Sequence, residues 1–174
     1  IDPYILPEAY ASEEVATNEF FDRAKDKAIL TVQKHSMLIK GDQRNNQIAR
    51  AYLLLGKARY YNGKYLQAIE AFTYLVKNMA GDNLAIEAEL WRSKSYSALG
   101  QHERAARELI NIAFSGTLNN EQYAVSQAAL ADALLKEGKD SLATEPLRKA
   151  FATEKSAYKR GRYAYLLGQL YEDL

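Results

Sequence analysis

The sequence predicts an all-α protein built from antiparallel helical hairpins, on the basis of a spacing that recurs three times. Glycines stand at Gly63, Gly100 and Gly138, 37 and 38 residues apart. Five residues after each glycine stands an alanine: Ala68, Ala105 and Ala143. Nine residues after each glycine stands a large apolar residue: Phe72, Leu109 and Leu147. Seven residues before each glycine stands a small residue: Gly56, Ser93 and Ala131. We therefore expect three copies of one structural unit.

Each recurring residue type has a reason in helix packing. Two helices approach to roughly 8–10 Å only where their side chains are small, which explains Gly56 and Ala68. Gly63 is expected to end the first helix with a positive φ, because a Cβ is disfavoured in that conformation. The pattern resembles the tetratricopeptide repeat (TPR), a helix–turn–helix unit of about 34 residues. This resemblance implies a TPR α-solenoid.

The spacing also sets the expected boundaries. We predict TPR units at residues 49–85, 86–123 and 124–160, and the first helix of a fourth unit at 161–174, whose second helix would follow Leu174. Residues 1–48 are expected to form an extended segment and one long helix, which is either an incomplete repeat or a cap. That helix would run from Asn18 to Lys40, capped by Thr17 or Asn18 and ended by Gly41.

Two local features are expected inside these units. Asn119 and Gln122 have the spacing of a capping box at the start of a helix. Pro146 falls within a second helix and is expected to bend it, because proline removes one backbone hydrogen bond.

Composition excludes several classes of protein. Lys and Arg total 23 and Asp and Glu 22, for a net charge of +1, so no basic stripe suggests nucleic-acid binding. No apolar run reaches the length of about 20 residues that spans a bilayer, and the first residues, IDPYILPEAY, do not resemble a signal peptide. The absence of cysteine excludes disulfides. We expect the sequence to be part of a longer protein, because it ends inside an expected helix.

The residues offer little basis for catalysis. The two histidines, His35 and His102, lie 67 residues apart, and no group of His, Asp and Glu has the spacing of metal ligands. Acidic pairs such as Glu13–Glu14 are typical of solvated helix faces, and no glycine-rich phosphate loop is present. We therefore expect neither an enzyme nor a cofactor.

A binding groove is the expected functional feature, because the first helices of such units line a concave surface. The repeat positions that point into it predict these partner-binding residues: Arg50, Leu53, Lys57, Tyr60, Tyr61, Lys94, Arg162, Tyr165 and Gln169. This mixture of aromatic, aliphatic and basic residues suits an extended peptide or a loop of a partner protein. The alternative is a solvated groove with no dedicated ligand, against which the outward tyrosines weigh.

A closer resemblance covers nearly the whole chain, from about Ile5 to Leu174. It is carried by KHSMLI followed by AYLLLGKARYYNGKYLQAIEAF, and by GKDSLATEPLRKAF followed by KRGRYAYLLGQLYEDL. These stretches resemble the SprE/PorW family, TPR lipoproteins of the type IX secretion and gliding-motility apparatus. The resemblance implies a periplasmic adaptor that links the secretion ring to the outer-membrane translocon, with a lipid anchor upstream of this sequence. The alternative is a general outer-membrane assembly or peptide-binding TPR module.

Overall fold

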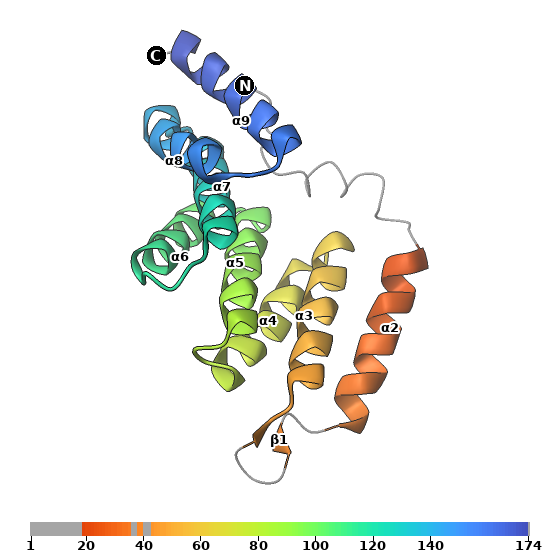
Figure 1. Cartoon of the computed structure of the whole chain (residues 1–174). Coiled ribbons are helices and arrows are strands. Elements are labelled where there is room, and N and C mark those ends of the chain that lie inside the picture. The colour runs from red at the N-terminus through yellow and green to blue at the C-terminus, as the bar shows by residue number, and fades with distance from the viewer. Residues whose placement is uncertain (1–18, 36–37, 40–42, 174) are drawn as a thin grey trace. The chain divides into compact units, whose positions relative to one another are not determined.

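The protein is helical throughout most of the computed structural model, which describes residues 19–35, 38–39 and 43–173 (Figure 1). The helices are α2 (Glu19–Lys34), α3 (Asn46–Tyr61), α4 (Tyr65–Asn78), α5 (Asn83–Ala98), α6 (His102–Phe114), α7 (Asn120–Lys136), α8 (Asp140–Thr153) and α9 (Ala157–Asp173). Between α2 and α3, the short strands β1 (Leu38–Ile39) and β2 (Gln43–Arg44) pair antiparallel. The predicted all-α class is confirmed.

The first helix is shorter than the sequence predicted. We expected it to continue to Lys40, whereas α2 ends at Lys34. Leu38 lies opposite Arg44 and Ile39 opposite Gln43 in the ladder, so their backbone groups bond across to β2 rather than along a helix. The prediction of one helix through Lys40 was therefore wrong. The expected cap at Thr17 or Asn18 and the expected stop at Gly41 lie outside the described residues.

The chain divides into two units, with the boundary between Ser95 and Tyr96 in the last turns of α5. In the first unit, α2 packs on α3 and α3 on α4. In the second, α6 packs on α7, α7 on α8 and α8 on α9. The predicted repeat starts at residues 49, 86, 124 and 161 are the fourth or fifth residues of α3, α5, α7 and α9. The repeat boundaries themselves stay a prediction.

Three of the interhelical turns are closed in the same way. Gly63, Gly100 and Gly138 have φ values of 69°, 79° and 69°, so the predicted left-handed glycine is confirmed. The residue after each glycine donates its N–H to a carbonyl five residues earlier: Lys64 to Arg59 at 2.8 Å, Gln101 to Tyr96 at 2.9 Å, and Lys139 to Leu134 at 2.9 Å. This is the Schellman pattern, which satisfies carbonyls that a helix end leaves unbonded.

The expected capping box is present at the start of α7. The Gln122 N–H donates to Asn119 Oδ1 at 2.9 Å, and the Asn119 N–H donates to Gln122 Oε1 at 3.0 Å. Pro146 lies inside α8, and the helix continues past it to Thr153. The bend expected there stays a prediction.

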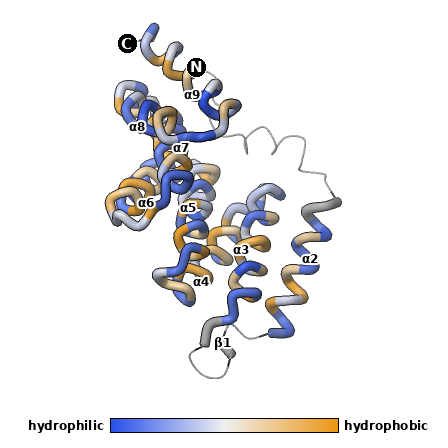
Figure 2. The backbone as a smooth tube through the Cα atoms, viewed as in Figure 1, coloured by the Kyte–Doolittle hydropathy of each residue, from blue (hydrophilic) through white to orange (hydrophobic). Residues whose placement is uncertain are grey.

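Close packing between α3 and α4 depends on a glycine. A Cβ built on Gly56 would lie 2.6 Å from Phe72 Cζ, and Phe72 is fully buried. Around this contact lie the buried core residues of the first unit: Ile48, Ala49, Leu53, Ala68, Leu75, Met79, Ala85 and Ala88. Figure 2 shows the corresponding alternation of hydrophobic and hydrophilic bands along the helices. Gly168 occupies the same place in the repeat, and a Cβ there would meet nothing within 4 Å.

We predict opposite effects for the same substitution at these two glycines. Gly56→Ala should destabilise the protein by about 1–3 kcal/mol, because the new methyl group overlaps the Phe72 ring. Gly168→Ala should stabilise it by roughly 0.5–1 kcal/mol, because alanine favours the helix and meets no neighbour. Urea unfolding followed by circular dichroism measures both changes. Equal effects at the two sites would contradict the packing described here.

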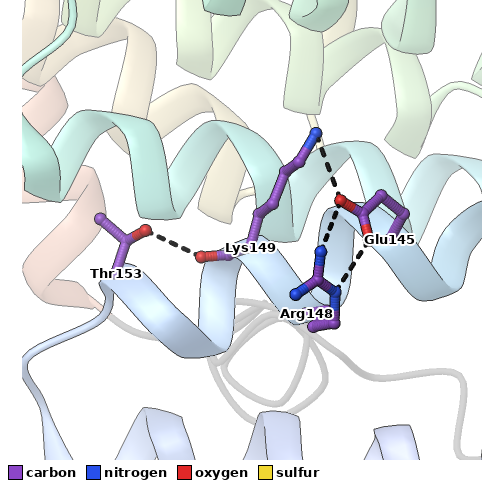
Figure 3. Close-up of polar contacts among 4 residues, drawn as sticks. All are labelled: Glu145, Arg148, Lys149 and Thr153. Carbon is purple, nitrogen blue, oxygen red and sulfur yellow. Dashed lines mark hydrogen bonds and ion pairs between the residues drawn. The ribbon is translucent and has the colours of Figure 1, made fainter.

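The outer surface of α8 carries a fork-shaped ion pair (Figure 3). Arg148 donates from Nε to Glu145 Oε2 at 2.8 Å and from a terminal nitrogen to Oε1 at 2.9 Å. Lys149 Nζ lies 3.5 Å from Glu145 Oε1, and Thr153 Oγ1 donates to the Lys149 carbonyl at 2.8 Å. The hydrogen bond from Arg148 is the main cause that lowers the pKa of Glu145 below its ordinary value of 4.5.

This ion pair predicts a small dependence of stability on pH. Because the folded-state pKa of Glu145 is lowered, its contribution is present above the ordinary pKa and is lost as the pH falls through the lowered value. The melting temperature of the wild type should therefore be slightly higher than that of Glu145→Gln at neutral pH. By about pH 2 the two melting temperatures should be equal. Thermal melts of both proteins across this range provide the measurement. A difference that stays constant in acid would exclude the ion pair as its source.

Candidate protein-binding surface

Four of the predicted groove residues come together in the first unit. Lys57, Tyr60 and Tyr61 lie three and four residues apart in α3, so they share one helix face. Lys94 shares a face of α5 with Glu87 and Trp91, which precede it by seven and three residues. These two helix faces meet, and we call the six residues Lys57, Tyr60, Tyr61, Glu87, Trp91 and Lys94 the Trp91 surface.

The indole of Trp91 is the centre of this surface. Its ring centroid lies 5.3 Å from that of Tyr60 and 5.8 Å from that of Tyr61, both in edge-to-face geometry. The ring of Phe72 stacks on it at 6.5 Å, which ties the surface to the core beneath. Tyr60, Tyr61 and Trp91 are all half-buried. Each edge-to-face pair stabilises by about 0.5–1.5 kcal/mol beyond its buried area, so the aromatic side chains are held in place.

Two ammonium groups lie against the same indole. Lys94 Nζ is 4.4 Å and Lys57 Nζ 5.3 Å from the Trp91 ring centroid, both within cation–π range. Lys57 Nζ also bonds Glu87 Oε1 at 2.5 Å, which joins α3 to α5. Because the side chains of Lys57 and Glu87 are 29% and 39% exposed, solvent screens this pair and its contribution to stability is small.

The exposure of the predicted residues in this unit is uneven. Arg50 is exposed, and Lys57 is half-buried. Leu53 is only 7% exposed and belongs to the hydrophobic core, while Lys94 is 5% exposed, with its Nζ over the Trp91 ring. We expected both side chains to point into the groove, whereas both are buried. Whether any residue of the set binds a partner stays a prediction.

The three predicted residues of α9 form a second small group, in the second unit. The Arg162 guanidinium carbon lies 5.8 Å from the Tyr165 ring centroid, and Gln169 Nε2 donates to the Tyr165 hydroxyl at 3.1 Å. Tyr165 is 57% exposed, whereas Arg162 and Gln169 are half-buried. The structure thus holds the tyrosine between an arginine and an amide on the surface of one helix.

Trp91 was missing from the predicted set, although it is the residue that organises the surface. The groove positions around Trp91 were assigned from the repeat alone, and Trp91 does not stand at one of them. A signal was nevertheless present in the sequence, since Glu87, Trp91 and Lys94 have the spacing of one helix face. The size of the indole brings it into contact with α3.

The histidine and metal expectations can be compared with the described residues. His102 is the first residue of α6, and its Nδ1 lies 3.1 Å from Ser97 Oγ across the turn. Within residues 19–35, 38–39 and 43–173, no group of three or more His, Asp or Glu side chains has the geometry to hold a metal ion. None of the helices over the same ranges has the length and apolar character needed to cross a membrane.

Comparison with known proteins supports the fold through solved structures. No protein-family model matches the sequence, and no curated protein matches it significantly. A kinesin light chain-like protein of Podosopora anserina with nearly identical TPR-like repeats matches with a TM-score of 0.69, and a variant of the same protein matches with 0.70. Each is 18% identical and covers 95% of this chain and 84% of its own. The chain therefore has the all-α, helical-hairpin fold of TPR-like repeat proteins.

Proposed function

We propose that this protein is a non-catalytic adaptor that docks a segment of another protein on the Trp91 surface. The observation that carries the proposal is the grouping of half-buried Tyr60, Tyr61 and Trp91 with basic side chains. Aromatic residues held rigidly at a surface are typical of the residues that supply most binding energy in protein interfaces. A TPR-like fold is consistent with this role, because such repeats serve as protein-interaction scaffolds.

The chemistry of the surface suggests what the docked segment contains. Tyr61 and Trp91 are half-buried aromatic residues, which suit contact with an apolar or aromatic side chain of the partner. Arg50 is exposed seven residues, about two helix turns, before Lys57, so a carboxylate on the same segment would meet positive charge. An extended peptide with one apolar anchor and a nearby acidic residue fits these features.

The apparatus in which the adaptor works is proposed from the resemblance to the SprE/PorW family. On this proposal the protein belongs to the type IX secretion and gliding-motility system and links its periplasmic ring to the outer-membrane translocon. It would lie in the periplasm, held to the outer membrane by a lipid attached upstream of Ile1. A general outer-membrane assembly or peptide-binding module is the alternative, since the Trp91 surface would also suit that role.

Photocrosslinking in cells that carry the gene for this protein separates these two assignments. A benzophenone side chain in place of Tyr61 should give an adduct with a subunit of the secretion ring or the translocon, because Tyr61 lies on the docking surface. The matched control is Tyr74, which is 40% exposed on α4 and stacks on Tyr52. Adducts of Tyr61 with general outer-membrane assembly proteins alone would favour the alternative function. Equal adducts from both positions would contradict docking at the Trp91 surface.

A titration tests the surface independently of the apparatus. With the crosslinked subunit purified, Lys57→Ala combined with Tyr61→Ala should raise Kd at least about tenfold, because an aromatic anchor and its neighbouring charge are lost. Leu66→Ala is the control, since Leu66 is 65% exposed on α4 and outside the surface. Circular dichroism should show the same helix content in all three proteins. Unchanged affinity of the double variant would exclude this surface as the docking site.

A further inference from the structure

The turn between α3 and α4 contains the only asparagine of the chain that a glycine follows, Asn62 before Gly63. In such a pair the backbone nitrogen of the glycine can attack the side-chain amide of the asparagine, because glycine has no side chain to hinder the approach. Asparagine is one of the thermolabile residues of proteins. Asn62 is half-buried and Gly63 is exposed, so the pair lies at the surface.

The reaction converts the side-chain amide of Asn62 into a carboxylate. A bond forms between Gly63 N and Asn62 Cγ, and the bond from Cγ to Nδ2 breaks, so that Nδ2 leaves as ammonia with the proton of the Gly63 N–H. Water then opens the resulting imide ring at one of its two carbonyls. The product is aspartate or isoaspartate, and the net change is the uptake of water and the loss of ammonia.

The folded turn holds the two reacting atoms apart. Asn62 has a ψ of 10°, which places Gly63 N beside the backbone nitrogen of Asn62 rather than beside its side chain. The Gly63 N–H donates to the Tyr60 carbonyl at 3.0 Å, and the Lys64 N–H donates to the Arg59 carbonyl at 2.8 Å. Ring closure needs a rotation that breaks these bonds. The reaction therefore waits for the turn to open, which helix ends do more readily than core segments.

Helix α2 restrains the same side chain. Asn62 Nδ2 donates to Asp22 Oδ1 at 3.2 Å, which joins the end of α3 to the first turns of α2. The hydrogen bond from Lys25 is the main cause that lowers the pKa of Asp22, so Asp22 is a carboxylate at neutral pH. Deamidation would remove the donor of this contact and place a second carboxylate beside the first.

The contact with Asn62 anchors one end of α2. Among residues 22–34 of this helix, Ala28 alone is buried, and Val32 packs half-buried against the core of the first unit. Both residues lie in the second half of α2, whereas Asp22 lies near its start. Loss of the hydrogen bond therefore releases the half of the helix that lies farther from these apolar contacts.

From these observations we propose that Asn62 is a deamidation site, that the closed turn and Asp22 slow its reaction, and that the product holds α2 less firmly. The aspartate product repels Asp22 across the former hydrogen bond. The isoaspartate product also lengthens the main chain by one carbon, which moves the N–H groups of Gly63 and Lys64 away from the carbonyls that they bind.

Peptide mapping by mass spectrometry during incubation at neutral pH measures the reaction at each asparagine. In urea, Asn62 should react faster than every other asparagine, because only it precedes glycine. In buffer, product should still form at Asn62, but at least about fivefold more slowly, because the turn must open first. Folded protein that yields no product at Asn62, or yields it as fast as in urea, would overturn the proposal.

Two aspartates of α2 separate the restraint from the sequence effect. Asp22→Ala should raise the rate in buffer about two- to fivefold, as expected for the loss of one hydrogen bond, and leave the rate in urea unchanged. Asp26→Ala is the matched control, since Asp26 is exposed on the same helix and contacts Lys25 at 4.0 Å. It should change neither rate. Equal rates in the two variants would exclude Asp22 as a restraint.

The effect of the product on α2 is measured with Asn62→Asp. This variant should melt about 1–3 °C below the wild type, and hydrogen exchange should be several-fold faster at the amides of α2. Combining it with Asp22→Asn makes the amide and the carboxylate exchange places, so the double variant should lose less stability than the sum of the two single variants. Wild-type exchange in α2, or strictly additive losses, would contradict the loosening.

Discussion

The structure depends on the close contact between a small residue of one helix and a bulky residue of the next. At Gly56 the backbone of α3 comes so near the Phe72 ring that no side chain would fit between them. This contact sets the distance between α3 and α4. The other buried residues of the same core, which include Ile48 and Ala88, pack around it. Hydrogen bonds close the turns, but the small residue decides how near the helices lie.

The candidate binding surface rests on that same contact. Phe72 fills the space over Gly56 on one side and stacks on Trp91 on the other, so the core holds the indole at a fixed depth. Tyr60 and Tyr61 then pack against the indole edge to face, and Lys57 joins the group to Glu87. A surface supported in this way is already ordered before a partner arrives, which lowers the entropy lost on binding.

Local rules made most of the fold predictable from the sequence. Gly63 and the Asn119–Gln122 pair depend on a few neighbouring residues, and the structure has both as expected. The end of α2 was missed because pairing with β2 competes with helix there. The burial of Leu53 and Lys94 was not expected, because a repeat position gives the direction of a side chain but not the size of its neighbours. Trp91 became central through its contacts with a helix some thirty residues earlier, which spacing alone does not show.

Trp91 is the only tryptophan in the chain, and this gives the surface a property of its own. Indole fluorescence from this protein arises entirely from the place where Lys57, Lys94 and two tyrosines surround one ring. The emission wavelength of indole depends on how much water and charge lie around it. The intrinsic fluorescence of the protein therefore reports on this one site. Binding of another molecule against the indole would change the emission wavelength and intensity.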